Sequence, residues 1–135
     1  AVLAKLRAMN VQLMLDGVRN VWIVKPGCSS RGRGIKVFDD LPTILKYCLN
    51  RKHATLVQKY LERPLLVDGK KKFDIRLWIL VTEWNPLTVW SFEPYFRLCT
   101  ADHTLDNLEN QYAHLCNRCV QKDSGEYDGD GGEGG

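Results

Sequence analysis

The segment of residues 24–38, VKPGCSSRGRGIKVF, combines glycines with cationic side chains that could bind phosphate groups. Lys25 precedes the first glycine, and Arg31 and Arg33 follow within the glycine-rich part. Glycine lets backbone N–H groups approach an anion closely, while lysine supplies a point charge and arginine a fork of donors. These residue types predict a loop that covers the phosphates of a nucleotide. The alternatives are an arginine-glycine contact with RNA and a solvent-exposed surface hairpin.

Neither of two standard phosphate-binding motifs fits this segment. Gly27 and Gly32 have the spacing of a P-loop, but Arg33 and Gly34 stand where its lysine and hydroxyl belong. A dinucleotide-binding fingerprint would need a third glycine in place of Val37 and a helix after it. The remaining phosphate-binding geometry is a glycine-rich hairpin between two antiparallel strands.

Two further segments, LVQKYLERPLL and KKKFDIRLW, place polar residues at the ends or along the polar faces of expected strands. These residues are Gln58, Lys59, Lys72, Asp74 and Arg76. Asp74 and Arg76 alternate with apolar residues and therefore share one face of their strand. They could form an ion pair with each other, or they could serve a nucleotide site.

Hydrophobic periodicity and turn residues predict the elements that carry these side chains. Apolar residues at helical spacing predict a packing helix over 2–15, a helix of about ten residues after Asp40, and a helical tendency over 104–121. Strands are expected at 20–25, 35–38, 54–63, 72–84, 87–92 and 95–100. The sequence therefore predicts an α+β fold rich in antiparallel strands, with the glycine loop joining two of them.

Charge is divided unevenly along the 135 residues, whose net charge is +3. Residues 123–135 hold five of the 16 acids and none of the 19 bases, so residues 1–122 carry a net charge of +8. A body this basic favours an anionic partner. The acidic, glycine-rich end contains almost nothing apolar and is expected to be disordered.

Cysteine usage and hydropathy indicate a reducing, non-membrane environment. The five cysteines show no disulfide-framework spacing, and no apolar run approaches the roughly 20 residues that span a bilayer. His114, Cys116 and Cys119 lie close together, but they lack the second ligand pair of a typical zinc site. Buried thiols are therefore favoured over a metal, and the chain is expected to be soluble and intracellular.

Four runs of sequence carry a specific resemblance. VWIVKPGCSSRGRGI, LVQKYLERPLLVDGKKKFDIRLWILVTEWNPLTVW, YFRLCT and HLCN, in this order, closely resemble the tubulin tyrosine ligase-like family over about residues 18 to 122. The resemblance implies an ATP-grasp-like fold, an antiparallel-strand-rich sheet with flanking helices. KPGCSSRGRGI, FDIRLWILVTEWNPLTVW and HLCN are most similar to the branch that ligates glycine to tubulin.

The resemblance implies an ATP-dependent reaction with Mg²⁺, in which a glutamate side chain is phosphorylated and then attacked by the amino group of free glycine. Its implied partners are acidic tubulin or microtubule tails and free glycine, with no nucleic acid or membrane. A monomer in the cytoplasm, the cytoskeleton and the cilium or flagellum axoneme is expected. A tubulin polyglutamylase and a catalytically inactive microtubule-binding module are the alternatives.

The resemblance also assigns roles to individual residues. The implied nucleotide-binding residues are Lys25, Arg31, Gly32, Gln58, Lys59, Tyr60, Leu61, Lys72, Phe73 and Asp74. Within this set Lys25 is expected on the phosphates, residues 58–61 on the adenine, and Asp74 on the ribose. Arg31 is also placed to meet an acceptor glutamate.

Two arginines and the HLCN segment complete the implied site. Arg76 and Arg97 are expected to stabilise the charge that develops during phosphoryl transfer. His114 and Asn117 resemble a family segment near the acceptor, and Asn117 is taken as a substrate-binding residue.

The resemblance stops before the family's magnesium ligands, which lie in a later acidic strand ending in Glu-x-Asn. Nothing after Gln121 resembles that strand, so no metal ligand is expected in this chain. We expect a packing helix or N-terminal remnant over 1–17, and an acidic tail over 123–135. Residues 18–122 are expected to form an incomplete catalytic domain that corresponds to the central part of the family's ATP-grasp-like domain. The isolated chain is expected to be inactive. A further alternative is that the acidic tail binds to the basic groove of residues 1–122 in place of a substrate.

Overall fold

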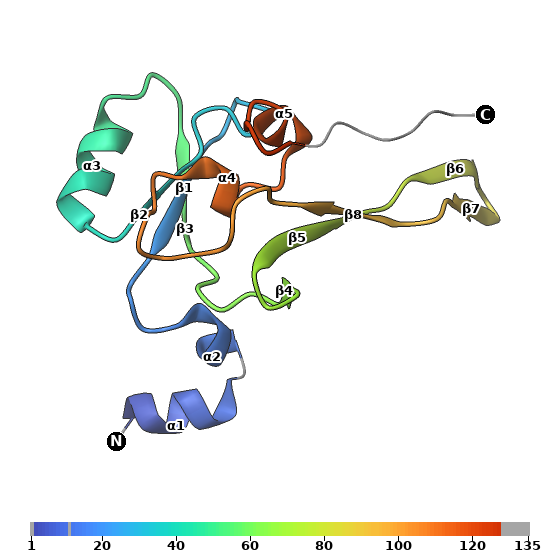
Figure 1. The fold of residues 1–135 in the computed structure, drawn as a ribbon. Coiled ribbons are helices and arrows are strands. Elements are labelled where there is room, and N and C mark those ends of the chain that lie inside the picture. Colours follow the sequence, from blue (N-terminus) through green and yellow to red (C-terminus); the bar gives the residue numbers. More distant parts are fainter. Residues whose placement is uncertain (1, 11, 128–135) are drawn as a thin grey trace.

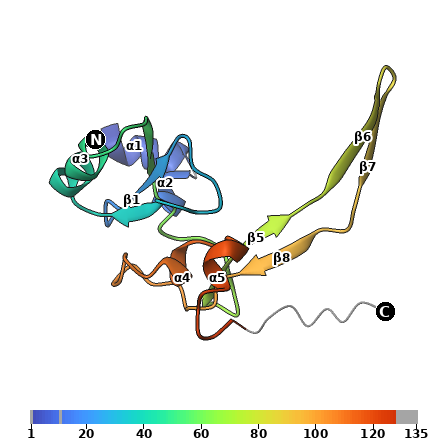
Figure 2. The same ribbon diagram turned by 90° about the horizontal axis from the view of Figure 1, so that it is seen from above.

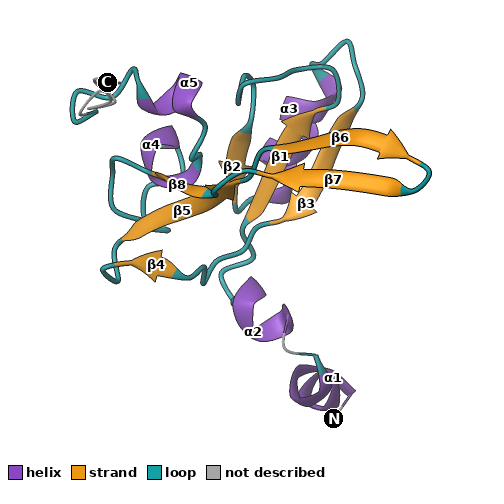
Figure 3. Cartoon of the chain, turned by 90° about the vertical axis from the view of Figure 1, so that its right-hand side faces the viewer, coloured by secondary structure: helices purple, strands orange, loops and turns teal. Residues whose placement is uncertain are grey.

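The computed structural model describes residues 2–10 and 12–127 (Figure 1). Within these residues, three small antiparallel sheets carry the strands (Figure 3). The first sheet has the order β2-β1-β3 and consists of β1 (Trp22–Pro26), β2 (Lys36–Phe38) and β3 (Thr55–Lys59). The second has the order β4-β5-β8 and consists of β4 (Leu66–Val67), β5 (Lys71–Arg76) and β8 (Tyr95–Leu98). The third is the hairpin of β6 (Ile79–Trp84) and β7 (Leu87–Ser91).

The hairpin around the glycine loop is confirmed. β1 and β2 pair antiparallel with Ile23 opposite Val37, and the glycine-rich loop connects them. β3 pairs with the other edge of β1 and places Gln58 opposite Ile23. The loop therefore connects the central strand of the sheet to an edge strand, and β1 and β3 of this sheet carry Lys25 and Gln58.

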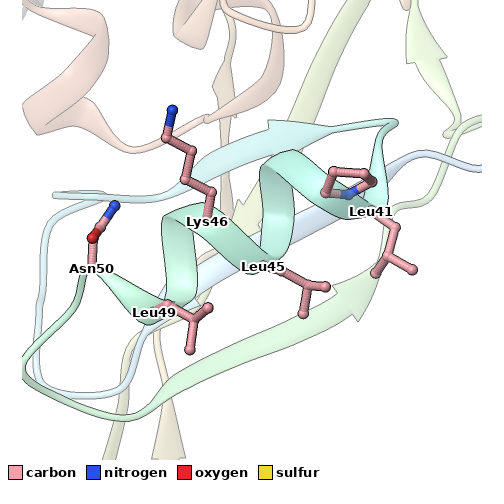
Figure 4. A pocket seen from close by; sticks show the side chains of 6 residues that line it. Leu41, Leu45, Lys46, Leu49 and Asn50 are labelled. Atoms are coloured by element: carbon pink, nitrogen blue, oxygen red, sulfur yellow. The ribbon is translucent and has the colours of Figure 1, made fainter.

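The predicted helix after Asp40 is α3 (Leu41–Leu49). The Asp40 carboxylate caps it by accepting from the Thr43 N–H at 2.8 Å. The hydrogen bonds from the Thr43 hydroxyl and from the Thr43 N–H lower the pKa of Asp40. Ile44 is buried toward the sheet, whereas Leu41, Leu45 and Leu49 are exposed along one side of the helix (Figure 4). The helix is thus amphipathic, with a second apolar stripe facing solvent.

The long strand predicted over 72–84 is two strands, which is a correction to the sequence expectation. β5 pairs with β8, whereas β6 pairs with β7, and the pairing partner changes at Leu77 and Trp78. Residues 77–81 are all apolar and contain no turn residue, so the pattern alone does not reveal the break. The β6–β7 hairpin projects away from the rest of the chain (Figure 2).

The helices at the two ends are shorter than the periodicity predicts. The segment expected as one helix over 2–15 forms α1 (Val2–Met9) and α2 (Gln12–Asp16), separated at Asn10, whose side chain accepts from the Gln12 N–H. Val2, Leu6 and Met9 are exposed. Residues 104–121 contain only two short helices, α4 (Gln111–His114) and α5 (Arg118–Gln121).

The core lies between the first sheet and the segment that carries α4 and α5 (Figure 1). Its buried members are Val21, Ile23, Val37, Tyr60, Leu115 and Val120. Residues 123–127 continue from α5 as hydrogen-bonded turns, and the rest of the predicted disordered tail, 128–135, lies outside the described residues. No helix in the described ranges is long and apolar enough to cross a membrane.

A buried carboxylate fixes the start of the first sheet. Glu62, 5% exposed, accepts from the backbone N–H groups of Arg19 at 2.8 Å and Val21 at 2.9 Å and from Lys59 Nζ at 2.6 Å. Burial alone would raise the pKa of Glu62, but these three donors outweigh it and lower the pKa. Gly17 is required beside it, because a Cβ there would lie 2.1 Å from Glu62 Oε2.

Glu62→Gln is expected to lower the free energy of unfolding by roughly 2–4 kcal/mol, because it removes the charge that three donors share. The pKa of Glu62 in the folded chain lies below its ordinary value of 4.5, so the carboxylate stabilises the fold above that pH and loses its effect as the pH falls through the folded value. Urea unfolding at pH 7 and below measures both. The exposed Glu83→Gln is the control, and equal stability of the two variants at pH 7 would contradict this role.

Candidate nucleotide-binding site

The first part of the site is a lysine and an amide on neighbouring strands. Lys25 Nζ donates to Gln58 Oε1 at 2.8 Å. The register pairs Lys25 with Leu56 and Ile23 with Gln58, which places Lys25 and Gln58 on the same face of the first sheet. Gln58 is exposed and carries no charge, so the positive charge of Lys25 stays available to an anion.

The second part is Lys72, which β5 of the second sheet carries toward the first. Lys72 Nζ donates to Tyr60 Oη at 3.0 Å and to the His114 carbonyl oxygen at 2.8 Å. It also lies 4.7 Å from the centre of the Tyr60 ring. Burial lowers the pKa of Lys72, and the positive charge of Lys25 acts in the same direction. Two sheets therefore bring two cations together, where an anion would stabilise both.

Asp74 and Arg97 form a two-fold ion pair across the β5–β8 ladder. Arg97 Nε and Nη2 donate to the two oxygens of Asp74, each at 2.6 Å, because the two residues stand directly opposite each other. The alternative ion pair of Asp74 with Arg76 is therefore not formed. The Arg76 guanidinium instead lies 4.4 Å from the centre of the Trp78 ring.

A cavity of about 860 Å³ opens beside this ion pair. Arg76, Arg97 and Arg118 all line it, together with Cys99 and Cys116, and none of the described lining residues is acidic. Arg76 and Arg97 thus line the same cavity, and Arg118 joins them. A cavity with this charge favours a phosphate or carboxylate ligand.

The glycine loop reaches the start of α5. Gly32 has a φ of +78°, and a Cβ there would lie 2.8 Å from Val120 Cγ2 and 3.3 Å from Asn117 Oδ1. Arg31 precedes it with a φ of +61° and is exposed. The loop and α5 lie side by side (Figure 1), so Arg31, Gly32 and Asn117 occupy one region although they are far apart in sequence.

Residues 58–61 and Phe73 have mostly internal side-chain contacts. Lys59 Nζ points away from Lys25. It donates to Glu62 Oε1 at 2.6 Å and to the Asp16 carbonyl oxygen at 2.8 Å. Tyr60 is buried, Leu61 is half-buried, and Phe73 packs edge-on against Phe96 at 5.3 Å between ring centres. In the 58–61 segment, the groups that remain for a ligand are the Gln58 amide and the backbone.

His114, the first residue of the HLCN segment, is buried, and its ring points into the protein interior. His114 Nδ1 lies 2.9 Å from Tyr60 Oη, and Nε2 lies 3.1 Å from the Asn107 carbonyl oxygen, so both nitrogens have partners. Cys116 is buried 3.4 Å from Cys99, sulfur to sulfur, whereas Cys119 is exposed. Across the described residues, no group of three or more His, Cys, Asp or Glu side chains is arranged to hold a metal ion.

Sequence reasoning missed two features of the site. The contact of Lys72 with Tyr60 and His114 joins residues from three separate segments, and no spacing in the sequence encodes it. Arg118 directly follows Asn117, so its charge next to a predicted substrate residue was a usable signal.

Comparison with known proteins gives a consistent result. The family model described as "Tubulin-tyrosine ligase family" matches residues 1–133. The chain is 48% identical over 127 residues to the human tubulin monoglycylase TTLL3, a match that covers 90% of this chain and 16% of that protein. It is 49% identical over 109 residues to tubulin glycylase 3B of Tetrahymena thermophila, covering 80% of this chain and 9% of that protein. It is also 46% identical over 128 residues to the human protein monoglycylase TTLL8, covering 90% and 15%. The chain thus spans less than a fifth of the length of each of these relatives.

The fit of the glycine loop against α5 yields a prediction. Gly32→Ala and Gly69→Ala both place a Cβ at positive φ, which costs about 1 kcal/mol. Only at Gly32 does the new Cβ overlap a neighbour, Val120, because nothing lies within 4 Å of the corresponding position at Gly69. Urea unfolding should therefore show a greater loss of stability for Gly32→Ala. Equal losses would mean that the loop does not rest on α5.

Proposed function

This chain belongs to the tubulin-tyrosine ligase family, and we propose that it forms the nucleotide-binding part of an ATP-grasp-like ligase that joins glycine to glutamate side chains of tubulin tails. The observation that carries the proposal is that Lys25 of the first sheet and Lys72 of the second are close enough for the charge of Lys25 to lower the pKa of Lys72, while a separate cavity is lined by three arginines. Such a concentration of cations suits the polyphosphate of ATP. The names of the relatives, which include tubulin monoglycylase and tubulin glycylase, favour glycine over glutamate as the amino acid joined.

In this function, different residues of the chain bind the phosphates, the adenine and the ribose of ATP. Lys25 and Lys72 contact the phosphates, and the glycine loop around Arg31 and Gly32 covers them. The backbone of residues 58–61, with the Gln58 amide, reads the adenine edge. Asp74 accepts a hydrogen bond from the ribose while its ion pair with Arg97 fixes the carboxylate orientation. Phe73 packs behind the site against Phe96.

The proposed reaction takes place in two steps, phosphorylation of the acceptor glutamate and attack by glycine. A carboxylate oxygen of the acceptor glutamate attacks the γ-phosphorus of ATP, the bond to the β-phosphate oxygen breaks, and ADP leaves. The amino group of glycine then attacks the acyl phosphate, loses a proton and expels inorganic phosphate, which leaves an isopeptide bond. Arg76 and Arg97 stabilise the charge that develops on the transferred phosphoryl group. Mg²⁺ bound with ATP would supply further charge neutralisation, and none of the residues assigned above would be its ligand.

The acceptor side of the site follows from charge and position. Residues 1–122 are strongly basic, which suits the acidic tails of tubulin or microtubules. We assign Arg31 and Asn117 to the acceptor glutamate, and the contact of Gly32 with α5 supports this assignment because Gly32 follows Arg31 and lies next to Asn117. We propose action as a monomer in the cytoplasm, on the cytoskeleton and the axoneme of cilia or flagella. The isolated chain is expected to bind ATP without incorporating glycine.

ATP should raise the melting temperature of the 135-residue chain, because a ligand that binds only the folded state stabilises it, by about 1.4 kcal/mol at ten times its Kd. Lys25→Ala removes a phosphate contact, and Asp74→Ala removes the ribose acceptor and releases Arg97, so both should abolish the shift. Lys46→Ala on the exposed side of α3 is the matched control and should retain it. A shift with RNA and none with ATP would contradict the proposed function, as would an ATP shift that both site variants retain.

A further inference from the structure

A chain of hydrogen bonds leads from Lys72 into the interior of the protein. Lys72 Nζ lies 3.0 Å from Tyr60 Oη, Tyr60 Oη lies 2.9 Å from His114 Nδ1, and His114 Nε2 lies 3.1 Å from the carbonyl oxygen of Asn107. Tyr60 and His114 are only 3% and 2% exposed. Because buried polar groups need partners, these four groups constrain one another.

The chemistry of the four groups allows one arrangement of hydrogens. An ammonium group can only donate and a carbonyl oxygen can only accept. His114 Nε2 must therefore carry the hydrogen that is donated to Asn107. In the neutral ring Nδ1 is then bare and accepts from the Tyr60 hydroxyl, whose oxygen is left to accept from Lys72.

The surroundings favour these protonation states. Burial lowers the pKa of His114, and the positive charge of Lys72 acts in the same direction, so the imidazole stays neutral near pH 7. Burial also raises the pKa of the Tyr60 hydroxyl, which therefore keeps its proton. The His103 ring closes the cluster at 5.7 Å from the centre of the His114 ring and 6.3 Å from that of Tyr60.

We propose that His114 is a positioning residue for Lys72. It acts twice: its ring orients the Tyr60 hydroxyl so that the oxygen lone pair faces Lys72, and its own carbonyl oxygen accepts from Lys72 at 2.8 Å. Two N–H groups of the ammonium are thereby fixed in direction, and the direction of the third follows. This inference rests on the proposed function, which assigns that third N–H group to a phosphate oxygen of ATP.

The role differs from the one that the HLCN resemblance suggests for His114. The ring does not face the exposed loop around Arg31 but points toward Tyr60 and Asn107. His114 therefore acts on the nucleotide side of the site, through Lys72, and contacts no substrate itself.

NMR of the 135-residue chain tests the arrangement without any nucleotide. In ¹⁵N-labelled protein at pH 7, His114 should show the tautomer with hydrogen on Nε2, and the fixed Lys72 ammonium should give a ¹⁵Nζ signal that exchanges slowly with water. Tyr60→Phe keeps the ring under Lys72 but removes the hydroxyl, so this signal should broaden or vanish. Tyr112→Phe is the matched control, because its hydroxyl bonds only the exposed segment at Asp123.

A second pair of variants separates positioning from folding. His114→Asn leaves a side-chain oxygen near the position of Nδ1 and should partly retain the Lys72 signal, whereas His114→Leu should lose it. In ATP titrations, Tyr60→Phe should weaken binding about tenfold, which corresponds to about 1.4 kcal/mol, and Tyr112→Phe should not.

The outcomes are distinct. A His114 tautomer with hydrogen on Nδ1, or a Lys72 signal that persists in folded Tyr60→Phe and His114→Leu, would overturn the positioning role. If the NMR results are as expected but the wild-type chain does not bind ATP, the positioning of Lys72 stands and the proposed function fails.

Discussion

The contact of Lys72 with Tyr60 and His114 holds the candidate site together. Lys25 and Gln58 belong to the sheet of β1, β2 and β3, whereas Asp74 and Arg97 belong to the sheet of β4, β5 and β8. Lys72 crosses between them: it is carried by the second sheet and donates to Tyr60, which directly follows β3 of the first. Lys72 is therefore a direct link between the two halves of the site, in addition to the core that packs the first sheet against the segment of α4 and α5.

This arrangement also explains why the site is suited to an anion. Taking a lysine out of water is unfavourable unless its charge is compensated, and Asp74, the carboxylate whose charge acts on Lys72, is already bonded twice to Arg97. The lowered pKa of Lys72 reflects that cost. A phosphate between Lys25 and Lys72 would supply the missing negative charge, and Arg76 of the neighbouring cavity would add to the same positive field. Binding and the internal stability of the site thus favour each other.

Local patterns in the sequence predicted the local structure well. The β1–β2 hairpin, the capped helix α3 and the antiparallel pairing of the later strands follow from strand flanks, an N-cap aspartate and turn residues. Periodicity states which residues share a face but not which partner lies opposite, so it could not distinguish Arg76 from Arg97 as the partner of Asp74. It also could not show that Lys59 turns to the buried Glu62, or that α5 meets Gly32, because these contacts join distant segments.

The most direct test of the central claim is a titration of the ¹⁵N-labelled chain with ATP, followed through the backbone amide signals. If Lys72 unites the two sheets into one nucleotide site, the shifts should cluster at Lys25, the glycine loop and residues 58–61 of the first sheet, and at residues 72–76 and Arg97 of the second, with one common Kd. Shifts confined to one sheet, or two sets that titrate with different Kd values, would contradict the claim.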